Sequence, residues 1–583
     1  MRRFTLYALL ITKLISQELN QSALTFNNNL SYKDDLRYHL TPFLLEIAKN
    51  GKSFSSEEKH KLESLGFDFN TPLVSRKSVK RSESDGLDKS YDSGIIRFHY
   101  TTSGNHAVNN SDINGNSIPD YIDSVAMIFN NVTNLLHNKM GYLQPPSDGY
   151  YSSDRDKGGS EHYDVYIRNL SSRYYGYVQP EEFAQSTGDN EKSISRKEKN
   201  AFTSYMAMRN NYKNFPLEEL MNIKVTIAHE YYHAIQFGYD GWEKPWLLES
   251  SAVWMEEEIY DEINDCYQYM EEWFNFPHRS LDESGYHWYG SFIFFEYIEQ
   301  HMGGNSTIRK ILDQSAISDS REIDGSHLAI DRALNKLGYS FQQALNGMSI
   351  ANFIMSSQSN AGDFSYEEAE SYPVNRPAIF QKINFEMGNV DTIRSISLSR
   401  FGSEYIQIFS TTPIQIDLKN ISGPFSDIQM NSIITKNDDS YLILSTPSIN
   451  IDPLDIKSIH LSIVSQDSLS NNWDYNIIIR DGKSGTNSNV PMDFNLSNPY
   501  PNPFNGLIKF SVYMLRDTRI TIDVYDITGR KVDHLYNDKL NSGNHNFTWH
   551  GKNIAKNKLS TGIYYIKVAT EINQEWKKIT FIK

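Results

Sequence analysis

"VTIAHEYYHAIQFGYD", from Val225 to Asp240, carries two histidines four residues apart, with a glutamate directly after the first. On a helix, His229 and His233 lie on one face, so their imidazoles can reach a single ion, as zinc requires of two nitrogen ligands. Glu230 stands beside the first histidine, where its carboxylate can take a proton from a water molecule. The apolar flanks predict a buried helix, and a core helix with two hydrogen-bonded histidines is the alternative.

A second helix is expected over "KPWLLESSAVWMEEEIY", which begins at Lys244. A hydrolytic zinc site needs three protein ligands and one open position. Glu249, sixteen residues after His233, is the candidate third ligand, since the turn "GYDGWEKP" leaves room for the chain to return. The alternative is that Glu249 is an acid near a helix N-terminus, stabilised by the helix dipole.

This pair of helices resembles the gluzincin clan of metallopeptidases. In its aminopeptidase-like branch the third-ligand helix reads Trp-Leu-x-Glu-Gly-x-Ala, with a further acid seven positions after the ligand. The matching residues here are Trp246, Leu247, Glu249, Ala252 and Glu256, and a serine replaces the glycine. The resemblance implies that Glu256 accepts a hydrogen bond from a ligating imidazole, although "MEEE" is also typical of a solvated face. The Gly-x-Met-Glu-Asn motif of that branch is missing, so exopeptidase specificity is not carried over.

The segment "SGYHWYGSFIFFEYIEQ" resembles the clan's Tyr-x-x-Gly segment, which supplies a hydroxyl to the oxyanion formed during hydrolysis. With Gly290 as the glycine, the tyrosine position is taken by His287, and Tyr286 and Tyr289 flank it. Tyr286 and His287 are the expected donors. Plain aromatic packing at the start of an apolar helix is the alternative.

An upstream loop, "DINGNSIPDYID", spaces oxygen donors as a calcium loop of the EF-hand type does. The donors at positions 1, 3, 5, 7, 9 and 12 are Asp112, Asn114, Asn116, the carbonyl of Ile118, Asp120 and Asp123. The glycine, Gly115, stands two places before the sixth position, which Ser117 occupies, and the last acid is Asp instead of Glu. A turn rich in Asn, Gly and Pro before a helix is the alternative to a calcium site.

The chain has 583 residues, a net charge of −16 and one cysteine, Cys266. This length predicts roughly three or four domains. The acidic balance argues against a nucleic-acid binder, and one cysteine excludes an intramolecular disulfide. Arg2 and Arg3 followed by a largely apolar run predict a signal peptide over residues 1–18, with a frayed helix as the alternative. No later run reaches the roughly 20 apolar residues of a membrane span.

The C-terminal segment carries Pro-Asn-Pro-Phe from Pro501, Tyr-Asp-x-x-Gly-Arg from Tyr525, Gly-x-His-x-x-x-Trp-x-Gly from Gly543 and Ser-Thr-Gly-Ile-Tyr from Ser560. It resembles the C-terminal sorting domain of type IX secretion cargo. The resemblance implies a small antiparallel β-sandwich and export through the outer membrane of a Gram-negative bacterium by that machinery, with release or attachment at the surface. Strand alternation alone is equally typical of a generic immunoglobulin-like module.

The sequence therefore predicts a multidomain α+β protein: a gluzincin-like, mostly helical zinc metallopeptidase domain, a β-sandwich domain and an immunoglobulin-like sorting domain. The expected ranges are 1–18 (signal peptide), 19–92 (propeptide or N-terminal subdomain), 93–370 (peptidase), 371–482 (β-sandwich), 483–492 (linker) and 493–583 (sorting domain). "HYTTSG", "YDVYI", "YGYVQPEE" and the two helices also resemble an uncharacterised bacterial family of secreted, predicted zinc metalloproteases.

The expected activity is hydrolysis of peptide bonds in proteins by a water molecule that zinc activates, with Glu230 as general base. Two alternatives remain open: an inactive surface adhesin or glycan-binding protein built on a peptidase-like domain, and a metallohydrolase acting on a non-peptide bond.

Overall fold

A computed structural model describes the following residues: 40–71, 73–76, 86–146, 157–170, 174–184, 200–316, 326–420, 428–466, 473–483, 494–497, 499–514, 517–541, 543–570 and 574–583. The predicted signal peptide and residues 484–492 of the predicted linker lie outside them. The chain divides into two compact units, the first within Met1–Met270, Ser284–Glu299 and Gly303–Ala333 and the second within Glu271–Glu283, Gln300–Met302 and Leu334–Lys583.

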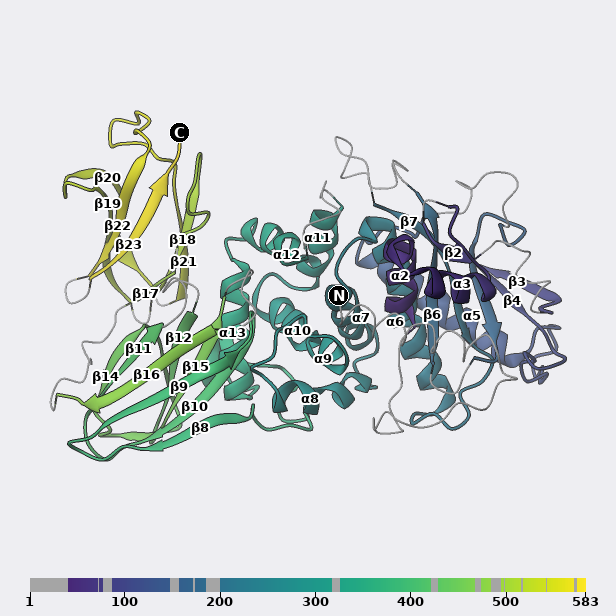
Figure 1. Ribbon diagram of the computed structural model, residues 1–583, viewed down its shortest axis with the longest axis horizontal. Coiled ribbons are helices and arrows are strands. Elements are labelled where there is room, and N and C mark those ends of the chain that lie inside the picture. The colour runs from purple at the N-terminus through teal and green to yellow at the C-terminus, as the bar shows by residue number, and fades with distance from the viewer. Residues whose placement is uncertain are drawn as a thin grey trace. The chain divides into compact units, whose positions relative to one another are not determined.

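The first unit is built on a five-stranded sheet in the order β3-β4-β5-β7-β6 (Figure 1). Its strands are β3 (Lys89–Ser93), β4 (Ile96–Tyr100), β5 (Tyr163–Arg168), β6 (Gly176–Phe183) and β7 (Phe202–Arg209). Strands β4, β5 and β7 run parallel, and β3 and β6 are antiparallel strands at the two edges. The parallel strands β5 and β7 are buried along their whole length, as expected of strands covered on both faces.

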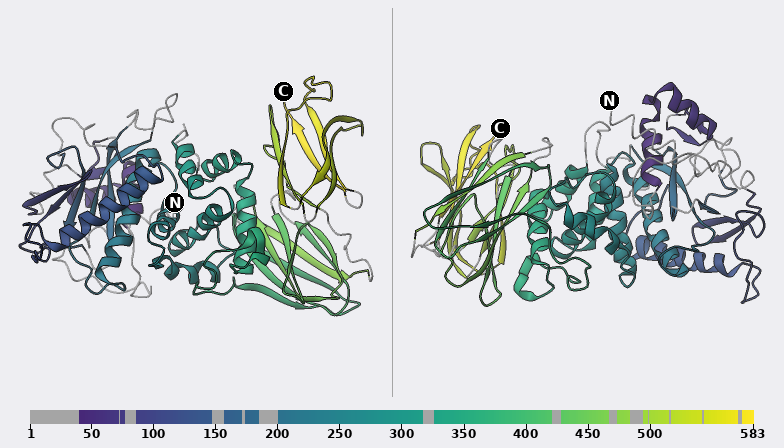
Figure 2. Two further views of the ribbon diagram at one scale, coloured as in Figure 1. Left: turned by 180° about the vertical axis from the view of Figure 1, so that it is seen from behind. Right: turned by 60° about the horizontal axis from the view of Figure 1, so that its bottom comes forward.

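Helices α5 (Asp120–Thr133) and α6 (Glu219–Asp240) cover one face of this sheet, as the view from behind in Figure 2 shows. Phe129 of α5 packs edge-on against Phe98 of β4, and Tyr231 of α6 packs against Tyr163 of β5. The opposite face carries an N-terminal segment with α2 (Thr41–Asn50), η1 (Gly51–Ser53), α3 (Ser56–Ser64), β1 (Phe67–Asp68) and β2 (Ser75–Arg76). The two faces are therefore covered by widely separated parts of the chain.

The remaining helices of the first unit follow α6 or continue α5. They are η2 (Asn134–Lys139), α7 (Pro245–Tyr260), η5 (Asp265–Tyr269), α9 (Tyr286–Gly290), α10 (Phe292–His301), α11 (Asn305–Ser315) and α12 (Ser326–Asn335), some of which reach the second unit at their ends. α7 starts with Pro245 at its first position, where a missing N–H costs no hydrogen bond.

The second unit begins with two sheets around one hydrophobic core, in the orders β13-β12-β15-β10-β8 and β14-β11-β16-β9. Their strands are β8 (Ile379–Asn384), β9 (Val390–Leu398), β10 (Ser403–Phe409), β11 (Ile414–Asn420), β12 (Ile428–Lys436), β13 (Tyr441–Ser445), β14 (Ser448–Ile451), β15 (Ile456–Ser465) and β16 (Trp473–Asp481). The unit also contains α8 (Met270–Asn275), α13 (Phe341–Ile354) and η6 (Ser359–Phe364).

A separate core holds together the C-terminal strands, which form sheets in the orders β17-β18-β21 and β20-β19-β22-β23. The strands are β17 (Phe494–Leu496), β18 (Ile508–Met514), β19 (Thr518–Asp526), β20 (Lys531–Leu540), β21 (Gly543–Trp549), β22 (Gly562–Ala569) and β23 (Gln574–Phe581). Trp549, the tryptophan of the sorting motif, is buried in this core, and its indole N–H donates to Asp533.

The expectation of a multidomain chain with helices, several sheets and a C-terminal sorting region is confirmed. The predicted domain ranges stay a prediction. Residue 92, the end of one range, lies inside β3, where Asp92 pairs with Arg97 and binds it in an ion pair. Phe353 of α13 stacks on Tyr405 of β10, and α13 belongs to the second unit.

Within the described residues, none of the helices combines the length and the apolar composition that crossing a membrane requires.

Candidate metal centre

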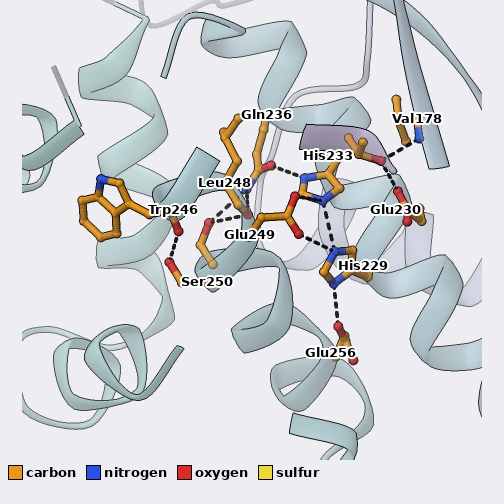
Figure 3. A network of polar contacts seen from close by, with 12 residues as sticks. Val178, His229, Glu230, His233, Gln236, Trp246, Leu248, Glu249, Ser250 and Glu256 are labelled. Carbon is orange, nitrogen blue, oxygen red and sulfur yellow. Dashed lines mark hydrogen bonds and ion pairs between the residues drawn. The ribbon is translucent and has the colours of Figure 1, made fainter. Parts of the chain in front are cut away.

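Helix α6 brings its two histidines together inside the first unit (Figure 3). The Nε2 atoms of His229 and His233 lie 3.1 Å apart, and both side chains are at most 1% exposed. The i, i+4 spacing places them on one face. Both Nε2 atoms therefore point at one location.

Helix α7 delivers a carboxylate to the same location. Glu249 places one oxygen 3.4 Å from Nε2 of His229 and the other 3.2 Å from Nε2 of His233. Ligand atoms of these three residues all lie within 4.8 Å of one another. Ligands about 2.05 Å from a tetrahedral zinc ion would be about 3.3 Å apart. The donor set and its spacing therefore fit zinc without a rearrangement.

The other ring nitrogen of each histidine, Nδ1, lies within hydrogen-bond distance of a side-chain oxygen. Nδ1 of His229 lies 2.5 Å from Glu256, and Nδ1 of His233 lies 2.8 Å from the amide oxygen of Gln236. An Nδ1–H donated to these oxygens leaves each Nε2 lone pair for a metal. Glu256 was predicted for this role, whereas Gln236 was missed, although it lies three residues after His233 on the same helix face.

Gln236 also joins the two helices, because its amide nitrogen donates to the carbonyl of Leu248 and to the hydroxyl of Ser251, both on α7. The charges of this cluster compensate one another. Burial lowers the pKa of His233, but the carboxylate of Glu249 outweighs it and raises that pKa to about 9. Burial likewise opposes the ionisation of Glu249, and the two imidazoles hold the pKa of its carboxyl well below the usual range.

The expected general base, Glu230, is completely buried and faces the edge strand β6. A methyl group at Gly176 of β6 would lie 3.3 Å from Cγ of Glu230 and 3.0 Å from the carbonyl oxygen of Ala207. The glycine thus permits the close approach of β6 to α6. One oxygen of Glu230 accepts a hydrogen bond of 2.8 Å from the hydroxyl of Thr41, at the start of α2.

The short helix α9 places a third aromatic residue at the centre. Tyr289 is buried, and burial together with the charges of Glu249 and Glu230 raises the pKa of its hydroxyl well above 10. Tyr286 packs its ring against Tyr269 and Tyr289, and His287 is buried. The donor role assigned to Tyr286 or His287 stays a prediction, and Tyr289 joins them as a candidate.

The calcium-like loop leads into α5, whose first turn contains Asp120 and Asp123, and residues 112–117 of the loop are exposed. The carboxylate of Asp112 accepts backbone N–H groups of the loop, and the amides of Asn114 and Asn116 donate to Asp123. Asp120 accepts from Ser111 and from the N–H of Ile113. These contacts are also typical of an Asn/Asp-rich turn. Calcium binding stays a prediction, which a thermal-shift titration with Ca²⁺ would test.

Residues 498–583 match the family described as a secretion system C-terminal sorting domain. This tail implies export through the outer membrane to the cell surface or the medium, and it suggests an interaction with the secretion machinery. No curated protein matches the chain.

Among solved structures, parts of the chain are similar to three proteins. PorZ, a surface component of the type-IX secretion system of Porphyromonas gingivalis, is 19% identical over 18% of this chain and 14% of its own, with a TM-score of 0.12. Dimeric latent PorU from the same organism is 12% identical over 36% and 19%, with a TM-score of 0.18. A β-1,2-glucanase from Parabacteroides distasonis is 12% identical over 30% and 28%, with a TM-score of 0.11. The chain spans less than a third of each, and these scores carry no argument about function.

Proposed function

We propose that the protein is a secreted zinc-dependent metallopeptidase of the gluzincin type that hydrolyses peptide bonds in proteins. The observation that carries the proposal is the convergence of His229, His233 and Glu249, whose closest ligand atoms lie 3.1–3.4 Å apart. An incidental pair of core histidines would not need a third, distant carboxylate at tetrahedral spacing.

Each residue of the centre would have a separate role in peptide-bond hydrolysis. When bound, zinc would supply a Lewis acid that makes a water molecule acidic near neutral pH. Glu230 would take the proton of the attacking water on its carboxylate and pass it to the departing amine. Tyr289, Tyr286 or His287 would donate a hydrogen bond to the oxyanion. Glu256 and Gln236 would hold the two imidazoles in the ligating tautomer.

The test compares full-length wild-type protein with Glu230→Gln. The proposal expects both proteins to bind zinc. Only the wild type should hydrolyse casein, once the buried centre has been made accessible to the substrate. The neutral amide keeps the shape of the side chain but cannot take the proton, so the rate should fall by about two to four orders of magnitude. Equal hydrolysis by both would exclude Glu230 as the base, and zinc binding without any hydrolysis would favour the inactive adhesin.

A further inference from the structure

One hydroxyl from the N-terminal segment connects the expected base to the edge of the sheet. Thr41 donates to Glu230 at 2.8 Å and accepts the backbone N–H of Val178 at 2.9 Å. Figure 3 labels Glu230 and Val178 and marks these two hydrogen bonds as dashed lines. The contacts span 189 and 137 residues of sequence, so local structure does not impose them.

The two groups that this hydroxyl binds are groups that a peptide substrate and a water molecule could bind instead. Val178 lies on β6, the last strand of its sheet, and edge strands bind extended peptides through their free N–H and C=O groups. A substrate carbonyl would accept the N–H that Thr41 accepts. A water molecule would donate to Glu230 where Thr41 donates. The threonine side chain thus satisfies both groups in place of substrate and water.

The centre is closed while α2 lies there. His229, Glu230, His233 and Glu249 are each at most 1% exposed, and Thr41 is 1% exposed. A hydrolytic metal site needs one position open to water and substrate. A peptide chain cannot reach this position unless some covering element moves.

The N-terminal segment that carries Thr41 has internal strand pairing and capping of its own. Strands β1 and β2 pair only with each other in the described part of the chain, in a sheet of two strands. Helix α3 has its own capping box. The segment is attached by side-chain packing, with Leu44 and Ile47 of α2 against Tyr177 and Tyr205 of the sheet, and by the ammonium group of Lys49, which donates to the carbonyl of Glu243.

We propose that residues 40–76 are an autoinhibitory segment, with Thr41 occupying the peptide-binding edge at Val178 and blocking Glu230. Hydrolysis then requires α2 to leave β6. The proposal rests on the proposed function, since it concerns access to the same centre, and it assigns the N-terminal segment the inhibitory role of a propeptide.

The experiment uses full-length, zinc-loaded protein and two readouts, the rate of casein hydrolysis and the rate at which a chelator removes the zinc. Leu44→Asp places a charge in the packing between α2 and the sheet. Thr41→Val removes the hydroxyl at constant shape, and Thr41→Ser keeps it. Ser56→Asp adds the same charge at an exposed position in the first turn of α3, within the same segment, and is the matched control. Thermal unfolding verifies that each variant is folded.

Release of α2 from β6 in Leu44→Asp should raise the rates of casein hydrolysis and of zinc removal by about tenfold or more. Each rate is proportional to the fraction of molecules in which the centre is open. Thr41→Val should shift both rates in the same direction, and Thr41→Ser and Ser56→Asp should match the wild type. If Leu44→Asp does not fold, Thr41→Val alone decides. A folded Thr41→Val protein with unchanged or lower rates overturns the proposal, and lower hydrolysis at unchanged zinc release would make Thr41 a positioning residue for Glu230.

The two readouts separate this proposal from the proposed function. Faster zinc removal without hydrolysis in any variant would uphold the block and exclude the peptidase. Equal hydrolysis by the wild type and all variants would uphold the peptidase and exclude autoinhibition. A protein that binds no zinc would exclude both.

Discussion

Substitution of Glu256 tests whether α7 supports the metal centre beyond supplying Glu249. The carboxylate lies 2.5 Å from Nδ1 of His229 in a buried pair. A hydrogen bond to a charged group contributes about 1.5–3 kcal/mol, which corresponds to about one to two orders of magnitude in affinity. Loss of such an outer partner typically weakens metal binding by about 10- to 100-fold. We therefore expect Glu256→Gln, which keeps a hydrogen-bond acceptor, to weaken zinc binding by about 10-fold. Glu256→Leu, which has no acceptor, should weaken it by about 100-fold.

The assay is a zinc competition titration against a chromophoric chelator at constant pH. The matched control is Glu258→Gln, two residues along the same helix, where the carboxylate accepts from Asn305 and not from a histidine. Its zinc affinity should equal that of the wild type. Unchanged affinity in both Glu256 variants, with the protein folded, would refute the reasoning that this carboxylate orients His229.

Three further outcomes are expected. Gln236→Leu should weaken zinc binding by about tenfold and lower the free energy of unfolding by about 1–3 kcal/mol, measured by chelator competition and urea denaturation; a loss of stability without a loss of affinity would leave the residue a purely structural link. Tyr289→Phe should reduce kcat for casein by about 10²- to 10³-fold with zinc retained if its hydroxyl serves the oxyanion, whereas unchanged kcat would return that role to the neighbouring candidates. Burial and two nearby cations lower the pKa of His460 from 6.5 to about 4. The folded chain therefore binds this proton more weakly than the unfolded chain. The free energy of unfolding of the second unit should be highest above pH 6.5 and should fall as the pH drops towards 4. At pH 4.5 the loss should be about 2–3 kcal/mol and should shrink in His460→Gln; parallel pH–stability curves for both proteins would contradict it.

The side chains of the candidate centre could be found in the sequence because each pair follows helical spacing. His229 and His233 are four residues apart, and Glu249 and Glu256 are seven apart, so each pair shares one helix face whatever surrounds the helices. Gln236 obeys the same rule and could have been found by asking which acceptor stands three residues after His233. The remaining contacts depend on tertiary packing.

The sequence around Thr41 does not predict its hydrogen bond to Glu230, because the two residues lie 189 positions apart. Tyr289 was not predicted as a donor, because aligning Gly290 with the glycine of the Tyr-x-x-Gly motif places His287 at the tyrosine position. The conformation of the short helix α9 determines which side chain lies near Glu249. Element boundaries depend on tertiary packing in a similar way. Asp92 ends a predicted range, yet it pairs with Arg97 and lies in the edge strand β3. Composition does not reveal which sheet a polar strand or an apolar helix such as α13 will join.

The central claim is that two imidazoles and one distant carboxylate hold a zinc ion. The most direct measurement is the zinc content of purified full-length protein, wild type against His233→Ala and Glu249→Ala, after dialysis against metal-free buffer. The account predicts about one zinc per chain for the wild type and a large loss in both variants. A wild-type protein without zinc, or variants that retain it fully, would contradict the account.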